Sequence, residues 1–137
     1  MKPFIFILLT LFVSCAREKE AQVEEINKII DPFFESYRIN GPKSAVSKLL
    51  GSNKFIRQDV TDTIAVRLDR LAKGFGKFQG VDKVSTHYYG ASIVEVTYLV
   101  NYDQQPMRFI FQFYQPGTGW RLQNFQYQSE FMDDLKE

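Results

Sequence analysis

The sequence predicts one α+β domain, in which three helices pack on a strongly curved, four-stranded antiparallel sheet. Two patterns support this fold class. Apolar residues in the first half of the chain recur every three or four positions, which is typical of helices, and those in the second half alternate with polar residues, which is typical of strands. The size fits one globular domain, because the chain has 137 residues, of which 45% are hydrophobic and 24% are charged.

The charge balance excludes several functional classes. The chain has 17 Lys and Arg residues against 16 Asp and Glu residues, so its field does not attract nucleic acids or acidic substrates from a distance. Residues 108–113 mix an arginine with aromatic residues on one expected strand, but they lack the glycines of the RNA-recognition signature. We therefore expect no nucleic-acid partner.

The first helix of the domain is expected over residues 24–38, because six apolar side chains fall on one helical face. They are Ile26, Ile29, Ile30, Phe33, Phe34 and Tyr37. Pro32 interrupts this pattern, since proline lacks the amide hydrogen that a helix interior requires. We expect the helix to kink or restart there, with Asp31 as the N-terminal cap.

Two further helices are expected before the strands begin. The second starts at Pro42, because proline is favoured in the first turn, and ends at residues 51–53. The third starts near Asp59 or Thr61, and Gly74 is expected to close it in the left-handed conformation. Their apolar faces comprise Val46, Leu49 and Leu50 in the second helix and Ile64, Leu68, Leu71 and Phe75 in the third.

Four strands are expected in the second half, over residues 78–89, 94–102, 107–114 and 120–127. In the second and third of these, every second residue is apolar, which indicates half-buried strands. Residues 103–106 and 115–119 contain proline or glycine and form the turns. The step between Leu122 and Phe125 breaks the alternation and predicts a β-bulge in the last strand.

The first 14 residues differ in composition from the rest. Lys2 precedes a mostly apolar run over residues 4–13, which is shorter than the about 20 residues that a membrane-spanning helix needs. This order is typical of a secretory signal peptide. Residues 11–15, LFVSC, resemble the bacterial lipobox, in which the cysteine is lipidated and becomes N-terminal after cleavage; Phe12 stands where leucine is commoner. A plain signal peptide or a buried anchor helix is the alternative.

Cleavage before Cys15 divides the chain into a signal peptide (1–14), the lipidated cysteine with a tether (15–25) and a folded domain (26–137). Residues 17–22 are polar and charged, which suits a tether or a frayed first helical turn. Cys15 is the only cysteine, so its lipidation leaves no thiol for a disulfide or a zinc site. The expected location is the bacterial cell envelope, where the lipid anchors the protein to the periplasmic or cell-surface face of a membrane.

Several passages of the domain resemble a known superfamily. They are KLLGSN (48–53), GKFQG (76–80), VTYLV (96–100), RFIFQFY (108–114) and the pattern WxLxxFxY from Trp120. Together with the order of helices and strands, they resemble the nuclear transport factor 2-like superfamily, and most closely its uncharacterised exported bacterial members. The resemblance spans residues 26–128. It implies a cone-shaped, cystatin-like domain that curls a sheet around its helices, and no particular activity.

Chemistry-bearing side chains are sparse. His87 is the only histidine, and Ser85 would stand about 6–7 Å from it along the strand, which rarely aligns a nucleophile with its base. Gly74, Gly76 and Gly80 leave a helix and enter a strand, whereas phosphate-binding loops run from a strand into a helix. We therefore expect no catalytic residue, no metal site and no cofactor.

Two surfaces are candidates for binding. The inner sheet face would line a pocket for a small apolar ligand, unless the domain fills it with its own side chains. The outer face mixes apolar and polar residues, which fits a homodimer or an envelope protein partner, or a plain hydrated face. The inner candidates are Tyr98, Tyr102, Phe109, Phe111, Phe113 and Trp120, and the outer ones are Ile93, Leu99, Ile110 and Tyr114.

The sequence thus predicts an envelope lipoprotein whose domain binds a small apolar ligand or a protein partner without catalysing a reaction. The alternative is a dimeric structural or assembly accessory that acts through the outer sheet face. A weak isomerase or hydrolase is the least favoured hypothesis, because no carboxylate or histidine alternates onto the inner face and Glu95 points away from it.

Overall fold

A computed structural model describes the backbone of residues 6–130 and the side chains of residues 17–130. Within residues 6–130, three helices precede four strands. The helices are α1 (Phe6–Asn40), α2 (Pro42–Gly51) and α3 (Gln58–Phe75). The strands are β1 (Phe78–Tyr89), β2 (Ile93–Tyr102), β3 (Met107–Tyr114) and β4 (Arg121–Gln128).

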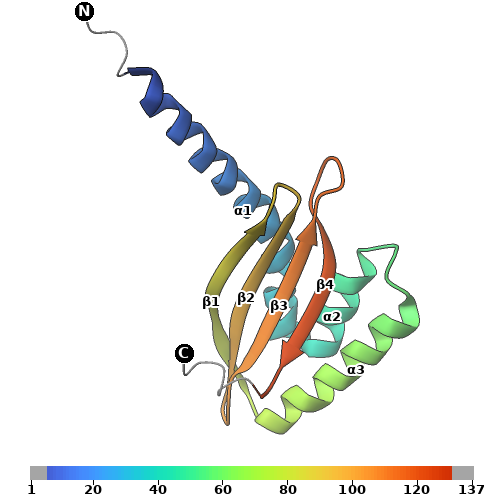
Figure 1. The fold of residues 1–137 in the computed structure, drawn as a ribbon. Coiled ribbons are helices and arrows are strands. Elements are labelled where there is room, and N and C mark those ends of the chain that lie inside the picture. Colours follow the sequence, from blue (N-terminus) through green and yellow to red (C-terminus); the bar gives the residue numbers. More distant parts are fainter. Residues whose placement is uncertain (1–5, 131–137) are drawn as a thin grey trace, which may run out of the picture.

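The strands form one antiparallel sheet in the order β1-β2-β3-β4, and the helices lie on one face of it (Figure 1). Helix α2 packs between α1 and α3 and also contacts β4. The N-terminal part of α1 projects beyond the body of the domain (Figure 1). The predicted α+β class, with three helices on a four-stranded meander, is therefore confirmed.

Helix α1 differs from the expected first helix in length and in continuity. It runs for 35 residues and passes through Pro32 without ending, so Asp31 lies inside the helix and is not a cap. Pro32 and Lys28 are both exposed, so water can hydrate the Lys28 carbonyl that the missing amide leaves unpaired. The segment 15–25, expected to be a tether, is also part of α1.

The ends of α2 and α3 follow the sequence signals with one exception. Pro42 begins α2, as predicted, and follows Gly41, whose φ is 85°. Helix α3 begins at Gln58, close to the expected start, and ends at Phe75. Its C-terminal cap is Gly76, with φ of 94°, whereas Gly74 lies within the helix. The prediction of Gly74 as the left-handed cap is therefore wrong by one half turn.

The strands lie where the sequence pattern predicts them, including the bulge in β4. Gln112 pairs with Asn124 and Phe113 with Leu122, so Gln123 is the extra residue. The central pair, β2 and β3, has an unbroken register from Ile93 to Val100. The sheet twists but does not curl strongly around the helices (Figure 1), and this central pair lacks the bulges that bend strands sharply. The expectation of a strongly curved sheet is therefore wrong.

The core lies between the sheet and the helices. Along β3, buried and half-buried residues alternate without a break, and the side chains of Phe109, Phe111 and Phe113 are fully buried. Phe33 and Tyr37 of α1 meet this row from the helical layer. The alternation therefore assigns one face of the sheet to the core and leaves the other face open.

Candidate functional site

The six aromatic residues of the expected pocket belong to the packed core. Phe109, Phe111 and Phe113 are each 0% exposed, and Tyr98, Tyr102 and Trp120 are also buried. Rings from α1 fill the space in front of them, with Phe33 and Phe111 centroids 5.3 Å apart and Phe34 and Tyr98 centroids 4.9 Å apart. The Phe33–Phe111 contact is edge-to-face and the Phe34–Tyr98 contact is tilted, and this packing fills the space in front of the phenylalanine row. Tyr98 also lines a groove beside α1, together with Phe34 and Phe78.

The buried tyrosines between α1 and the sheet are neutral hydrogen-bonding groups. The Tyr37 and Tyr102 hydroxyls form a hydrogen bond between α1 and β2. Burial raises the pKa of Tyr102 to about 12 and raises the pKa of Tyr37 well above the ordinary tyrosine value. Burial, followed by the nearby Asp31 carboxylate, also raises the pKa of Tyr98. At neutral pH these hydroxyls therefore hold their protons and do not act as bases.

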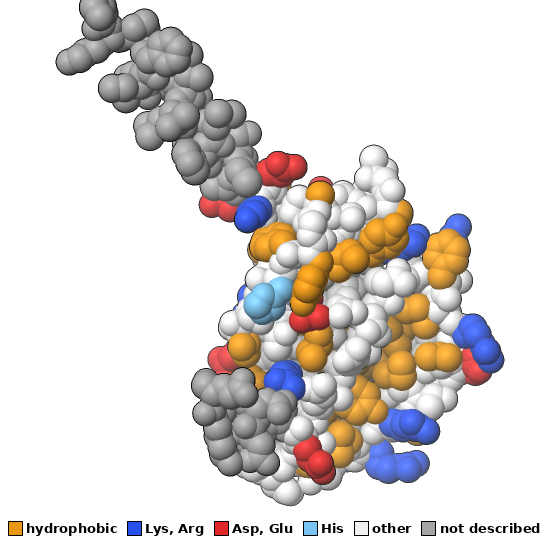
Figure 2. Space-filling view, in the orientation of Figure 1, with side chains coloured by type: hydrophobic (Ala, Val, Ile, Leu, Met, Phe, Trp, Pro, Cys, Tyr) orange, Lys and Arg blue, Asp and Glu red, His pale blue; other side chains and the backbone are white. Residues whose placement is uncertain are grey.

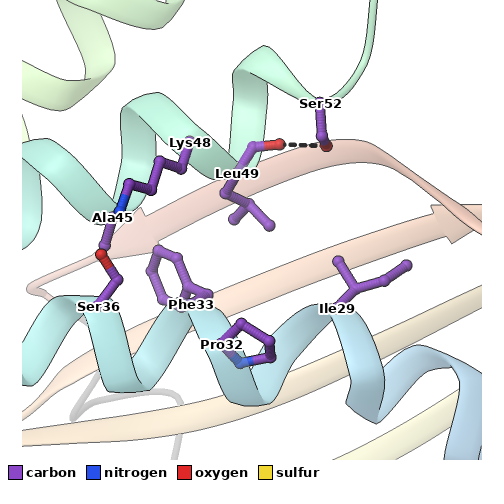
Figure 3. Close-up of a pocket in the computed structure, with 8 residues that line it drawn as sticks. All are labelled: Ile29, Pro32, Phe33, Ser36, Ala45, Lys48, Leu49 and Ser52. Atoms are coloured by element: carbon purple, nitrogen blue, oxygen red, sulfur yellow. Dashed lines mark hydrogen bonds between the residues drawn. The ribbon is translucent and has the colours of Figure 1, made fainter.

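A first open groove lies between α1 and α2, away from the aromatic row (Figure 3). It has a volume of about 170 Å³, and its lining comprises Ile29, Pro32, Phe33, Ser36, Ala45, Lys48, Leu49 and Ser52. The apolar side chains of Phe33 and Leu49 face each other across it, and the Lys48 ammonium and the Ser36 hydroxyl lie at one end (Figure 3). The groove is therefore apolar in the middle and cationic at one end.

A second groove lies on the outer face of the sheet. It has a volume of about 350 Å³, and its lining comprises Val84, Ser85, His87, Glu95, Thr97, Leu99, Arg108 and Ile110. Two of the predicted outer-face residues, Leu99 and Ile110, therefore lie in it. The other two, Ile93 and Tyr114, pair with each other across β2 and β3 at one end of the sheet.

Hydrogen bonds between side chains hold the polar residues of this outer groove in place. Gln112 donates to the Glu95 carboxylate at 2.7 Å, and Asn124 donates to the Gln112 carbonyl oxygen at 3.2 Å. The Arg108 guanidinium donates to the Gln128 side chain at 2.8 Å. The groove thus carries one anion and one cation in fixed positions beside three aliphatic side chains, those of Val84, Leu99 and Ile110.

The alternation of apolar and polar residues did not predict which residues of β1 line this groove. The register between β1 and β2 shifts between Lys83 and Ser85, so Val84 and Ser85 both reach the outer groove. Strict alternation would place one of them on the opposite face. No local signal indicates this bulge, because Val84 alternates in phase with Thr86 and Tyr88, which face inward opposite the buried Val96 and Val94.

Ser85, His87 and Glu95 line the same groove, and His87 pairs with Glu95 across the strands. The Glu95 carboxylate accepts a hydrogen bond from Gln112, and among the described residues none joins His87 to Ser85 or Glu95. An activated serine requires both of those contacts. Within residues 17–130, His, Asp and Glu side chains also form no group of three that could hold a metal ion.

Two comparisons with known proteins gave no match to this chain. The sequence matches no protein-family model and no curated protein. Cys15, the expected lipidation site, lies in α1, and its side chain is outside the described residues, as are residues 1–5 of the expected signal peptide. Of the helices that the structure describes, none has both the length and the hydropathy to cross a membrane.

Proposed function

We propose that this protein is a bacterial envelope lipoprotein, held to a membrane by a lipid on Cys15, whose domain binds a protein partner without catalysing a reaction. The lipobox-like segment LFVSC (11–15) supports the anchor. The order of three helices and a four-stranded meander supports a nuclear transport factor 2-like domain. The outer groove carries the binding proposal, because it is an open concavity that the domain's own elements do not cover.

The chemistry of the outer groove favours a protein partner. Leu99 and Ile110 supply an apolar centre, while Glu95 and Arg108 flank it with opposite charges. Protein interfaces combine an apolar centre with a polar rim in this manner. The side-chain hydrogen bonds of Glu95 and Arg108 hold these groups in position before a partner arrives, which lowers the entropy cost of association.

A second copy of the chain is the alternative partner for the same groove. A twofold axis through Ile110 would place the Arg108 cation of one copy near the Glu95 anion of the other, because both residues line one groove. Such self-complementarity is what an isologous dimer requires. In that case the protein is a dimeric structural or assembly accessory.

The substitution Ile110→Arg in the lipidated full-length protein tests the groove. A charge without a partner at the centre of an interface should weaken binding at least tenfold, which corresponds to about 1.4 kcal/mol. In-cell cross-linking should show loss of the partner band or of the dimer band. The control is Ile39→Arg, since Ile39 is an exposed isoleucine at the end of α1, outside the groove. Cross-linked products that are the same in both variants would contradict the proposal.

The groove between α1 and α2 favours a small apolar ligand as a second candidate function. Its apolar middle and its single cationic end fit an apolar molecule with a negative group. Native mass spectrometry of the protein, released from membranes in mild detergent, should show an added mass of a few hundred daltons. Ser36→Phe should fill the groove and remove that mass, whereas Asn40→Phe, one turn further along α1, should keep it. A mass that persists in Ser36→Phe would exclude this site.

A further inference from the structure

One end of the sheet carries a row of neighbouring residues on its outer face, which we call the end row. Tyr89 pairs with Ile93, Ile93 pairs with Tyr114, and Tyr114 pairs with Arg121, so one residue from each strand contributes. The row continues to Phe55, in the connection between α2 and α3, because the Arg121 guanidinium lies 4.8 Å from the centre of the Phe55 ring. It therefore crosses the whole width of the sheet.

The apolar side chains of the end row are unusually exposed. Phe55 is 66% exposed, Tyr89 is 54% exposed and Ile93 is 40% exposed. Figure 2 shows hydrophobic side chains in a band across this end of the sheet, next to the point where α1 leaves the domain. Contiguous apolar surface of this kind marks a contact with a partner or a membrane, whereas scattered single residues do not.

Cations accompany these apolar side chains. Arg121 lies between the rings of Phe55 and Tyr114, and the Lys54 ammonium lies 5.2 Å from the centre of the Phe55 ring. Arg121 Nε is buried without a hydrogen-bond partner, and no described carboxylate pairs with Arg121 or Lys54. The five residues of the row include no acidic side chain. The row therefore presents unneutralised positive charge beside aromatic rings, and this charge complements anionic phosphate groups.

A contact with α1 fixes the position of this row relative to Cys15. The Lys19 ammonium lies 5.3 Å from the centre of the Tyr88 ring, and Tyr88 adjoins the first residue of the row. Lys19 is four residues after Cys15 in the same helix, a separation of about 6 Å along the helix axis. The β1–β2 hairpin therefore lies at the end of the domain from which α1 leads back to Cys15 (Figure 1).

We propose that the end row lies in the headgroup region of the membrane that holds the anchor, with Phe55, Tyr89 and Ile93 toward the acyl chains and Lys54 and Arg121 at the lipid phosphates. This inference rests on the proposed lipidation of Cys15. Aromatic rings and cations are the residues that membrane interfaces favour. A lipid and a surface contact together also hold a protein more firmly than one acyl chain does. The anchor and the row would then fix how the domain stands on the membrane.

Spin labels at single introduced cysteines test this orientation. The lipidated full-length protein is placed in vesicles of equal parts phosphatidylethanolamine and phosphatidylglycerol, with the label at Phe55→Cys or Tyr89→Cys. The control is Ile39→Cys, because Ile39 is 61% exposed but lies at the other end of α1. Both row labels should lie within about 5–10 Å of the headgroup boundary. Their collision rate with a water-soluble paramagnetic reagent should be several-fold lower than that of the control label.

The outcomes separate the row from the anchor. If the protein carries its lipid but both row labels are as accessible to water as the Ile39→Cys label, the membrane-contact proposal is wrong and the anchor stands. If mass spectrometry finds Cys15 unmodified while the row labels are still protected, the anchor proposal is wrong and the row binds lipid by itself. Vesicles of pure phosphatidylcholine should reduce the protection of both labels, because they lack the anionic lipid that Lys54 and Arg121 attract.

Discussion

The hydroxyls of Tyr37 and Tyr102 satisfy each other in the core, since both residues are buried and form one hydrogen bond between α1 and β2. Either Tyr37→Phe or Tyr102→Phe should lower the free energy of unfolding by about 1–3 kcal/mol, because one buried hydroxyl loses its partner. The double substitution should cost less than the sum of the two single ones. Urea unfolding, followed by Trp120 fluorescence, measures all three variants. Additive losses would show that the two hydroxyls do not depend on each other.

The same pair predicts how stability changes at high pH. In the unfolded chain a tyrosine has a pKa of about 10, whereas burial raises the pKa of Tyr102 to about 12 and raises that of Tyr37 as well. The unfolded state therefore loses these protons first, so the contribution of this pair to the free energy of unfolding should be constant below about pH 10 and fall toward pH 12. The double phenylalanine variant should show a shallower fall over that range. If the free energy of unfolding falls equally steeply with pH in the unmodified protein and in the double variant, the tyrosine pair is not the cause of the fall.

Some buried residues make long-range contacts that no local sequence pattern predicts. Apolar spacing assigned Tyr37 to the core face of α1, and alternation assigned Tyr102 to the inner face of β2, but 65 residues separate them, and no local pattern indicates that they are partners. Asn53 was interpreted as part of a helix stop. In the structure it is buried, donates to the Leu122 carbonyl at 2.7 Å and accepts from the Phe55 amide at 2.9 Å. Asn53 therefore links the connection after α2 to β4, and this role depends on a contact between residues far apart in the sequence.

At the scale of elements, Gly74 and Gly76 offer a matched pair of substitutions at the end of α3. Gly76 has a φ of 94°, and an added Cβ would lie 3.0 Å from Asp103, so Gly76→Ala should cost about 1–3 kcal/mol. Gly74 lies in the helix with open space around it, so Gly74→Ala should add about 0.8–1 kcal/mol. Thermal unfolding should therefore shift in opposite directions. A stabilising Gly76→Ala would show that this connection adapts without strain.

The elements themselves could be predicted to different degrees. Strands β1 and β3 begin and end where the pattern places them, because alternation and turn residues are local signals. Continuity through Pro32 could not be predicted, since it depends on whether water reaches the Lys28 carbonyl, which only the packing of α1 decides. The bulge in β4 was predictable from the step between Leu122 and Phe125, whereas the shift after Lys83 breaks no such pattern.

At the scale of the whole molecule, alternation predicted which sheet residues face outward better than it predicted the shape of the domain. Leu99 and Ile110 lie in the outer groove, as alternation implies. The inner aromatic residues were correctly placed on the helix-facing side, but whether Phe33 and Phe34 would fill the space before them depends on how closely α1 approaches the sheet. Curvature likewise depends on the register of β2 and β3, where no bulge occurs.

The proposed lipid anchor at Cys15 yields a prediction for the molecule as a whole. Cys15→Ser removes the sulfur that would carry the lipid, so the protein should stay uncleaved or appear in the soluble fraction instead of as a mature protein in the detergent phase. Buried acyl chains contribute about 0.8 kcal/mol per methylene group, which the serine variant loses entirely. Ser14→Ala is the matched control, because it keeps a small residue before the intact cysteine and should be processed normally. Detergent-phase partitioning with immunoblotting, and the mass of the mature N-terminus, report both variants. A Cys15→Ser protein that still appears as a mature, detergent-phase species would show that the lipid assignment is wrong and that another feature of the chain holds it to the membrane.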